Sequence, residues 1–300
     1  MMIHPSQPPA PQECIPFREC RAKTCPDGSP GTTVFDHCRY AGYVAEGLLA
    51  LLPASARRLL PPETPFLVSL HDIGKVSPGF EGKYFIDLLR KRAPIFAEDF
   101  VKGGYATNHA SIGAKSLLRL FDLTPDHPVV RAVAAHHGFS PERLDFTRDG
   151  AWQQERDSLV RALAAEFGTV PEVATKADGP VDLLAGITCV SDWIASDESL
   201  FPPDEPPIPS EEGRRRAVDA LIRCGFVRNQ FRQGLSFRDI FGFDPYPAQQ
   251  AFLDAALSPG VYVLEAPMGM GKTEAALYAA YRLVEAGYHS GLYFALPTRL

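Results

Sequence analysis

The pair His71-Asp72, in the run SLHDIGKVSPGF, most constrains what this chain can fold into. It belongs to a series of imidazole and carboxylate side chains in or beside apolar, helix-like stretches: His37, His71, Asp72, His109, His136, His137 and Asp192. These ligand types suit Mn, Fe, Ni, Co or Zn and are less typical of a site built for Mg alone. Five histidines and two aspartates can hold two metals that share one carboxylate, which is equipment for hydrolysing a phosphate ester. A single such histidine would more simply be a hydrogen-bonded core residue, so the ordered series favours the metal site.

The segments around these residues have helical periodicity, and none before residue 225 indicates a strand. Pro53 ends the first helix, and Pro128 opens the one that carries His136 and His137, with Gly138 as its expected C-cap. His71 and Asp72 are expected on one turn of a helix, from which they can lean toward neighbouring metals. The predicted helices of this all-α part cover 33–52, 65 to near 78, 85–92, 109–121, 128–137 and 181–196, and one more helix follows the Pro-rich segment 201–213.

The pattern changes after residue 243. VYVLEA (261–266) predicts a buried strand, PMGMGKT a phosphate-binding loop, EAALYAAYRLVEAG a helix and GLYFALP a second strand. Ala266 stands where the strict loop pattern has its first glycine. The expected nucleotide-binding residues of the loop are Gly269, Met270, Gly271, Lys272 and Thr273. Lys272 would reach the β- and γ-phosphates, and the Thr273 hydroxyl would hold Mg²⁺.

Four parts follow from these changes of pattern: an irregular N-terminal arm over 1–30, the all-α domain over 31–230, a linker over 231–243 and the start of an α/β domain over 244–300. The Pro-rich segment 201–213 is interpreted as an insert within the all-α domain.

Hydrophobic content of 45% and charged content of 22% are those of a soluble globular protein. Neither an uninterrupted apolar run of membrane-spanning length nor a secretory signal occurs, so we expect a cytoplasmic protein with no membrane partner. The net charge of −6 does not indicate a nucleic-acid partner, so such binding must come from metals or local patches. The basic runs 90–92 and 214–216 are more simply solvated helix faces than phosphate contacts.

Four of the six cysteines, Cys14, Cys20, Cys25 and Cys38, lie close together in sequence but form no CxxC pair. Reduced thiols are the default, and a structural zinc site is the alternative.

The HDIGK run, with His37 before it and the other ligands after it, resembles the HD superfamily of metal-dependent phosphohydrolases. With FRDIFGFDPYPAQQAF and EAPMGMGKTEAAL…ALPTRL downstream, the chain is similar to the CRISPR-associated helicase–nuclease of type I systems. That family fuses an N-terminal HD nuclease to a superfamily 2 helicase. The resemblance implies an α + α/β fold, in which an all-α HD-domain metallohydrolase precedes the beginning of a RecA-like parallel α/β helicase lobe.

The resemblance also implies roles for the ligands. His37, His71, Asp72 and Asp192 would hold one metal, with Asp72 bridging to a second metal completed by His109, His136 and His137. Asp72, Lys75 and Ser196 would be the catalytic residues, with Lys75 and Ser196 near the scissile phosphate. The chain departs from the family pattern at Ala110, where a glutamate is frequent, and at Tyr246, where an arginine is frequent.

The expected cofactors are two divalent ions (Mn, Fe, Ni, Co or Mg), and ATP with Mg for the complete helicase. Gln249 would read adenine, and Thr298 with Arg299 would begin a strand-contacting motif. The sequence stops before an acidic DExx motif, so we expect no complete ATP-hydrolysis site within these 300 residues. The implied partners are single-stranded DNA and a CRISPR surveillance complex of the Cascade type, in antiviral defence.

Two other functions stay open. One is an HD-type phosphohydrolase that acts on free nucleotides, which the phosphate loop and Gln249 disfavour. The other is a non-catalytic HD module that has lost its metals, which the complete set of ligands disfavours.

Overall fold

The computed structural model describes residues 14–137, 150–170, 180–227, 232–289 and 291–295. The chain divides into two units, Met1–Phe226 and Val227–Leu300, each of which is described by itself. Among the described residues no helix combines the length and the apolarity that a membrane span needs.

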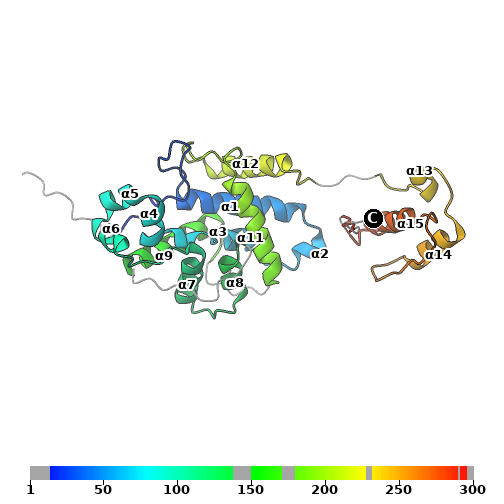
Figure 1. The fold of residues 1–300 in the computed structure, drawn as a ribbon, viewed down its shortest axis with the longest axis horizontal. Coiled ribbons are helices and arrows are strands. Elements are labelled where there is room, and N and C mark those ends of the chain that lie inside the picture. Colours follow the sequence, from blue (N-terminus) through cyan, green and yellow to red (C-terminus); the bar gives the residue numbers. More distant parts are fainter. Residues whose placement is uncertain (1–13, 138–149, 171–179, 228–231, 290, 296–300) are drawn as a thin grey trace, which may run out of the picture. The chain divides into compact units, whose positions relative to one another are not determined.

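The first unit is helical, and its described residues hold no strand beyond isolated bridges, as predicted (Figure 1). Its elements are α1 (Val34–Leu51), α2 (Ala54–Arg57), α3 (Thr64–Ser69), the 3₁₀ turn η1 (Ile73–Lys75), α4 (Pro78–Tyr84), α5 (Ile86–Arg92), α6 (Pro94–Val101), α7 (His109–Phe121), α8 (Pro128–Ala134), α9 (Gly150–Glu166), α11 (Val181–Ser196) and α12 (Ser210–Arg223). Of these, α2, α4, α6 and α9 were not predicted from the sequence.

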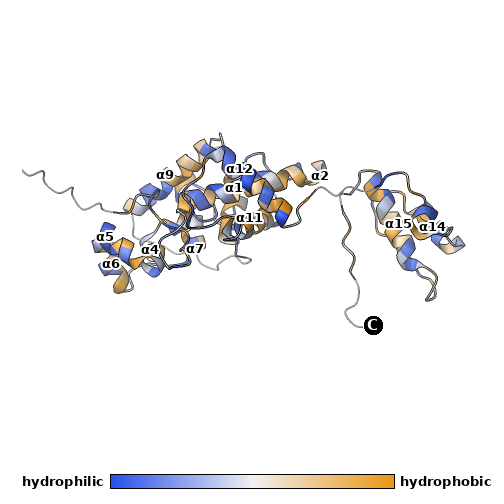
Figure 2. Cartoon of the chain, turned by 90° about the horizontal axis from the view of Figure 1, so that it is seen from above, coloured by the Kyte–Doolittle hydropathy of each residue, from blue (hydrophilic) through white to orange (hydrophobic). Residues whose placement is uncertain are grey.

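Helix α1 is the element around which the first unit packs. Thr33 caps it by accepting a hydrogen bond from the Asp36 amide, as expected of a threonine at this position. α3, α11 and α12 all pack against α1, while α7 and α8 pack against each other, and Figure 1 shows α12 lying along α1. Val34, Ala41 and Val44 of α1 are fully buried in the shared core. Figure 2 shows hydrophilic and hydrophobic residues together on helices such as α9, as expected of helices with one buried face.

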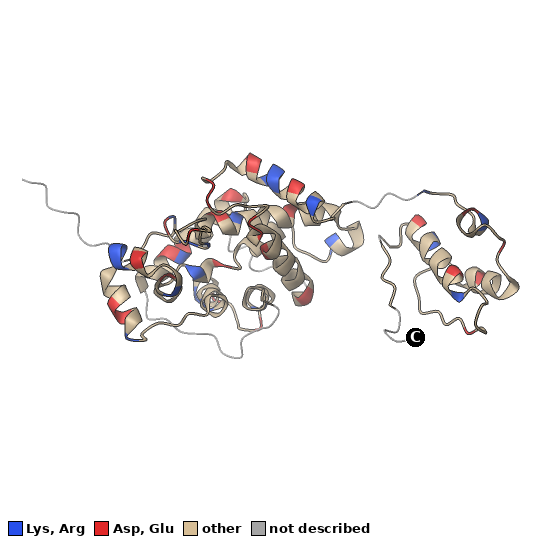
Figure 3. Ribbon diagram, turned by 45° about the horizontal axis from the view of Figure 1, so that its top comes forward, with Lys and Arg blue, Asp and Glu red and all other residues tan. Residues whose placement is uncertain are grey.

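The two basic runs are not open phosphate-binding patches. Arg92 forms an ion pair with Glu19, and Arg214 donates to Glu46 Oε2 at 2.8 Å. Figure 3 shows acidic and basic residues interspersed along α12. The positive charge of these runs is therefore largely compensated within the unit.

The N-terminal arm is irregular, and some of its described side chains are packed into the core while residues 26–30 are exposed. Ile15 and Cys20 are fully buried, and the Cys20 carbonyl accepts a hydrogen bond from the Val34 amide. The Arg21 amide donates to Oε1 of the buried Glu81, whereas Glu81 Oε2 has no hydrogen-bond partner in the part of the chain that the structure describes. All six cysteines are unbridged, and neither group of candidate metal ligands found among the described residues contains one.

Burial raises the pKa of Glu81 from its usual 4.5 to about 8, so the folded chain holds this carboxyl protonated at neutral pH. Between these two values the unfolded chain binds fewer protons than the folded chain. The contribution of Glu81 to the free energy of unfolding should therefore be largest below pH 4.5. It should fall by about 1.4 kcal/mol per pH unit between pH 4.5 and pH 8. Urea unfolding at a series of pH values would show this slope for the parent and its loss in Glu81→Gln. Parallel profiles for the two proteins would contradict the assignment.

The second unit contains α13 (Phe237–Phe241), α14 (Pro247–Ala255) and α15 (Lys272–Glu285). A capping box of Ser236 and Asp239 begins α13, and the buried Phe237 ring packs edge-on against Tyr278 of α15. Helix α13 thus falls inside the segment expected to be a linker.

The predicted strand over 261–266 is wrong for this structure. These residues carry no strand, and Val261 and Val263 are 96% and 78% exposed. A buried parallel strand needs neighbouring strands for its hydrogen bonds, and the described residues supply none to this segment. The second predicted strand, 291–297, is also not formed over 291–295. Residues 296 and 297 lie outside the described residues.

Candidate metal centre

His71 and Asp72 lie in a turn rather than on a helix, which corrects the sequence-based prediction. α3 ends at Ser69, and η1 begins at Ile73. The Leu70 and His71 amides donate to the carbonyls of Leu67 and Val68, three residues back. This tighter bonding ends the α-helix, as is common at helix C-termini. Both side chains are thereby placed in the buried interior of the unit.

Gly74 explains how this turn reaches α7. A Cβ atom at position 74 would lie 1.9 Å from the His109 carbonyl oxygen and 2.5 Å from the Gly113 amide nitrogen. Only glycine permits so close an approach of two backbones. The packing of η1 against the first turn of α7 places His109, the first residue of that helix, beside Asp72.

His136 and His137 also follow a helix instead of ending it. α8 begins at Pro128, as predicted, but stops at Ala134, and Ala135 is its C-cap. The predicted cap Gly138 lies outside the described residues. His136 is fully buried and its Nδ1 lies 2.6 Å from the Val133 carbonyl oxygen, whereas His137 is exposed.

The first group of donors consists of His37 from α1, His71 and Asp72 from the turn, and Asp192 from α11. One ligand atom of each lies within 4.8 Å of the others, and all four residues are buried. His37 Nε2 lies 3.0 Å from Asp72 Oδ2 and 3.2 Å from Asp192 Oδ1. His71 Nε2 lies 3.3 Å and 3.4 Å from the same two oxygens.

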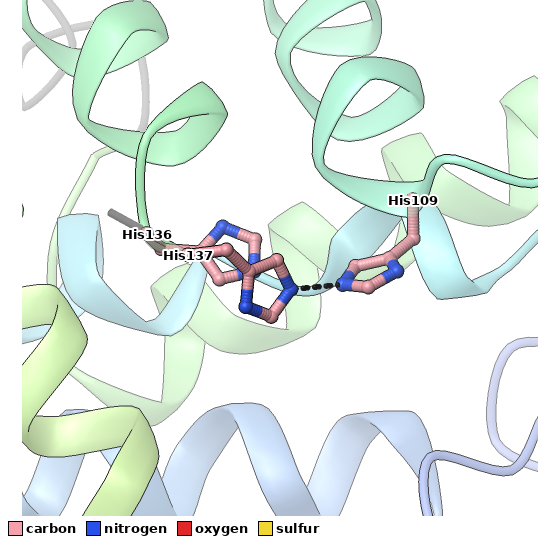
Figure 4. Close-up of side chains that lie close together, drawn as sticks. All are labelled: His109, His136 and His137. Atoms are coloured by element: carbon pink, nitrogen blue, oxygen red, sulfur yellow. Dashed lines mark hydrogen bonds between the residues drawn. The ribbon is translucent and has the colours of Figure 1, made fainter. Parts of the chain in front are cut away.

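The second group consists of His109, His136 and His137, whose ring nitrogens also lie within 4.8 Å of one another. Figure 4 shows the His109 ring, from the start of α7, pointing toward the His137 ring. Their Nε2 atoms are 3.0 Å apart.

Asp72 lies between the two groups. Its Oδ2 faces His37 and His71, while its Oδ1 lies 3.2 Å from His109 Nε2 and 3.6 Å from His136 Nε2. One carboxylate therefore presents one oxygen to each group.

Unpartnered atoms show that the donor set fits a cation. Asp72 Oδ1 and His136 Nε2 are buried, and neither has a hydrogen-bond partner among the described residues. The contact of His136 Nδ1 with the Val133 carbonyl assigns the ring proton to Nδ1, which leaves a lone pair on Nε2. Two buried acceptors that face each other are unfavourable. A divalent metal, for which imidazole and carboxylate are good ligands, would satisfy both.

The ionisation of the site agrees with this fit. Burial lowers the pKa of His136 to about 3, so its ring is a neutral ligand. Burial would also lower the pKa of His71, but the Asp72 and Asp192 carboxylates raise it to about 10. Burial opposes ionisation of Asp192, yet hydrogen bonds from His37 and His71 hold its pKa far below the usual range. Because metal ligands bind in their deprotonated form, a metal ion bound by His71 would take the place of the proton on this ring.

Of the three predicted catalytic residues, Asp72 belongs to the first group, and Lys75 and Ser196 border it. Lys75 Nζ lies 2.6 Å from Asp72 Oδ2, and the Ser196 hydroxyl donates to Asp192 Oδ1 at 2.9 Å. Sequence reasoning missed Lys23, whose ammonium donates to Ser196 Oγ at 2.8 Å. Its neighbours, in the run RAKTCPDG, carry no motif that could have revealed this contact.

In the second unit the phosphate-loop residues lie together with Gln249. Gly271 and Gly269 have positive φ angles, and α15 begins at Lys272. The buried Gln249 accepts a hydrogen bond from the Tyr246 amide and donates one to the Gly271 carbonyl. Lys272 Nζ donates to the Ala266 and Pro267 carbonyls. A hollow of about 450 Å³ is lined by Phe243, Tyr246, Met268, Gly269, Gly271, Lys272, Thr273 and Glu274. Thr298 and Arg299 lie outside the described residues.

Comparison with known proteins finds one matching family and several similar proteins. The family described as "Cas3, HD domain" matches residues 22–201. The CRISPR-associated endonuclease/helicase Cas3 of Thermus thermophilus is 32% identical, in an alignment covering 91% of this chain and 33% of the relative. The CRISPR-associated nuclease/helicase Cas3 of Streptococcus thermophilus is 28% identical over 78% of this chain and 30% of its own length.

The crystal structure of T. fusca Cas3–ADP has a similar fold, with a TM-score of 0.69 and 21% identity over 92% of this chain and 35% of that one. The chain spans about a third of the length of these relatives.

Proposed function

Since the chain belongs to the Cas3 HD-domain family, we propose that its first unit is a metal-dependent nuclease that cleaves single-stranded DNA. The observation that carries the proposal is the position of Asp72, whose two carboxylate oxygens face the two groups of donors. Relatives whose names include endonuclease or nuclease support the type of reaction.

We infer that His37, His71, Asp72 and Asp192 hold one divalent ion and that His109, His136 and His137, with Asp72, hold a second. The imidazole-rich donor set favours Mn, Fe, Ni or Co over Mg. Such ions, when bound, supply a nucleophile from water at neutral pH and neutralise charge on the phosphodiester.

The protein's own groups orient the ligands and the substrate. The Lys75 ammonium holds Asp72 Oδ2 in place. Burial would lower the pKa of Lys75, but the Asp72 carboxylate raises it, so Lys75 stays charged. The Ser196 hydroxyl fixes Asp192 Oδ1 toward His37 and His71. The Val68 and Val133 carbonyls set the ring orientations of His71 and His136.

We further propose a function for the longer helicase–nuclease protein in which an HD domain of this family occurs. It comprises ATP with Mg in a complete helicase, delivery of the strand by a CRISPR surveillance complex of the Cascade type, and action in the cytoplasm in antiviral defence. The helicase/nuclease names of the relatives and the association of Gln249 with the phosphate loop support it.

Cleavage of circular single-stranded DNA tests the nuclease assignment. The parent chain should cleave it with Mn²⁺, Co²⁺ or Ni²⁺ and less well with Ca²⁺, which prefers all-oxygen ligands, and EDTA should abolish cleavage. Lys272→Ala should cleave at the parental rate without ATP, because all seven proposed ligands lie in the first unit and Lys272 lies in the second. Cleavage indifferent to EDTA, or hydrolysis of mononucleotides in place of DNA, would contradict the assignment.

A further inference from the structure

A lysine of the N-terminal arm reaches the edge of the candidate metal centre. Lys23 Nζ donates to Ser196 Oγ, and Ser196 in turn donates to Asp192 Oδ1, which contacts both His37 and His71. One hydroxyl group therefore separates the Lys23 ammonium from the first group of donors.

The backbone of Lys23 is held in place by its neighbours. Its carbonyl accepts a hydrogen bond from the Gly31 amide, and antiparallel bridges join Arg21 to Thr33 and Thr24 to Pro30. A Cβ atom at Gly31 would lie 2.9 Å from Pro203, so this turn is also in close contact with the segment after α11. The arm thus fixes the position from which the lysine extends.

The Lys23 ammonium has hydrogen-bonding capacity in reserve. It carries three N–H donors, and among the described residues its hydrogen-bond acceptor is Ser196 Oγ. Its charge has no direct carboxylate partner there, since Asp192 lies beyond the serine. Burial and the Lys75 ammonium lower the pKa of Lys23, and the more distant carboxylates of Asp192, Asp72 and Glu198 oppose this shift without reversing it. An additional anion beside it would be favourable.

We propose that Lys23 binds a phosphate oxygen of the nucleic-acid strand at the metal centre and that Ser196 anchors its ammonium for this contact. This inference rests on the proposed nuclease function. Lys75 and Lys23 then supply positive charge to the strand from two separate segments, η1 and the arm, in a chain whose net charge is −6. The alternative is a purely structural role, in which the Lys23–Ser196 hydrogen bond only attaches the arm to α11.

Lys23→Gln separates these two roles, because glutamine keeps an N–H donor for Ser196 but removes the charge. Affinity for a fluorescent oligo-dT is measured by anisotropy in EDTA, where cleavage is suppressed, over a range of salt concentrations. We expect Lys23→Gln and Lys23→Ala to bind about tenfold more weakly than the parent. The slope of log K against log salt should become shallower by about 0.7, the value for one lost phosphate contact on a single strand. Lys23→Arg should restore both quantities.

Lys102→Gln is the matched control, because the Lys102 side chain is 71% exposed on α6's C-terminal side and pairs only loosely with Asp99, at 3.7 Å. It should bind as the parent does. In Mn²⁺, KM for the oligonucleotide should rise in Lys23→Gln, while melting temperature stays at the parental value. If Lys23→Gln binds with the affinity and salt slope of the parent while the parent cleaves DNA with Mn²⁺, the proposed role of Lys23 is wrong and the nuclease function stands. A parent that cleaves no DNA with any of the metals would contradict the proposed function and remove the basis of this inference with it.

Discussion

Replacing Asp72 with alanine should release both divalent ions and reduce DNA cleavage by at least about a hundredfold. Loss of a single supporting contact around a metal costs about 10- to 100-fold in affinity or activity, and Asp72 presents one oxygen to each group of donors. Asp72→Asn, which keeps the shape of the side chain, should have the same effect. Metal content after gel filtration, measured by mass spectrometry, should fall from two ions per chain to none.

Two comparisons make this result specific. His137→Ala removes an exposed ligand of the second group alone and should lose one ion and keep the other. Asp182→Ala, an exposed carboxylate in the first turn of α11, should retain both ions and full activity. Two tightly bound ions in both Asp72 variants would show that this carboxylate is not shared.

Gly74→Ala should destabilise the first unit by about 3 kcal/mol or more, because the new methyl group would meet the backbone of His109 and Gly113. Backbone atoms cannot move aside as a flexible side chain can, so η1 and α7 must separate. That separation moves Asp72 from His109 and should also lower metal occupancy of the second group. Urea unfolding and metal content would measure the two effects.

Gly186→Ala is the matched control for this substitution. Gly186 lies within α11, and nothing in the described structure lies within 4 Å of the place a Cβ atom would take. Alanine there should be neutral or stabilise by up to about 1 kcal/mol, because alanine favours the helix. Equal stabilities for the two variants would show that the approach of η1 to α7 does not need glycine.

The helices of the first unit could be predicted where local signals suffice. Helix α1 ends before Pro53 and Pro128 opens α8 as expected, and α11 spans the predicted residues 181–196. The order of histidines and aspartates also indicated which residues the structure brings together.

Tertiary contacts explain what the sequence did not reveal. The turn at His71-Asp72 depends on the approach of η1 to α7, which periodicity cannot report. The contact between Lys23 and Ser196 joins residues 173 positions apart. The segment 261–266 has the composition of a buried strand, but a strand also requires a paired neighbour, and composition carries no information about one.

The most direct test of the central claim is the anomalous diffraction of crystals of the parent chain grown with Mn²⁺. The account predicts two anomalous peaks, one among His37, His71, Asp72 and Asp192 and one among His109, His136 and His137, with an Asp72 oxygen as a ligand of each. A single peak, or peaks away from Asp72, would contradict it.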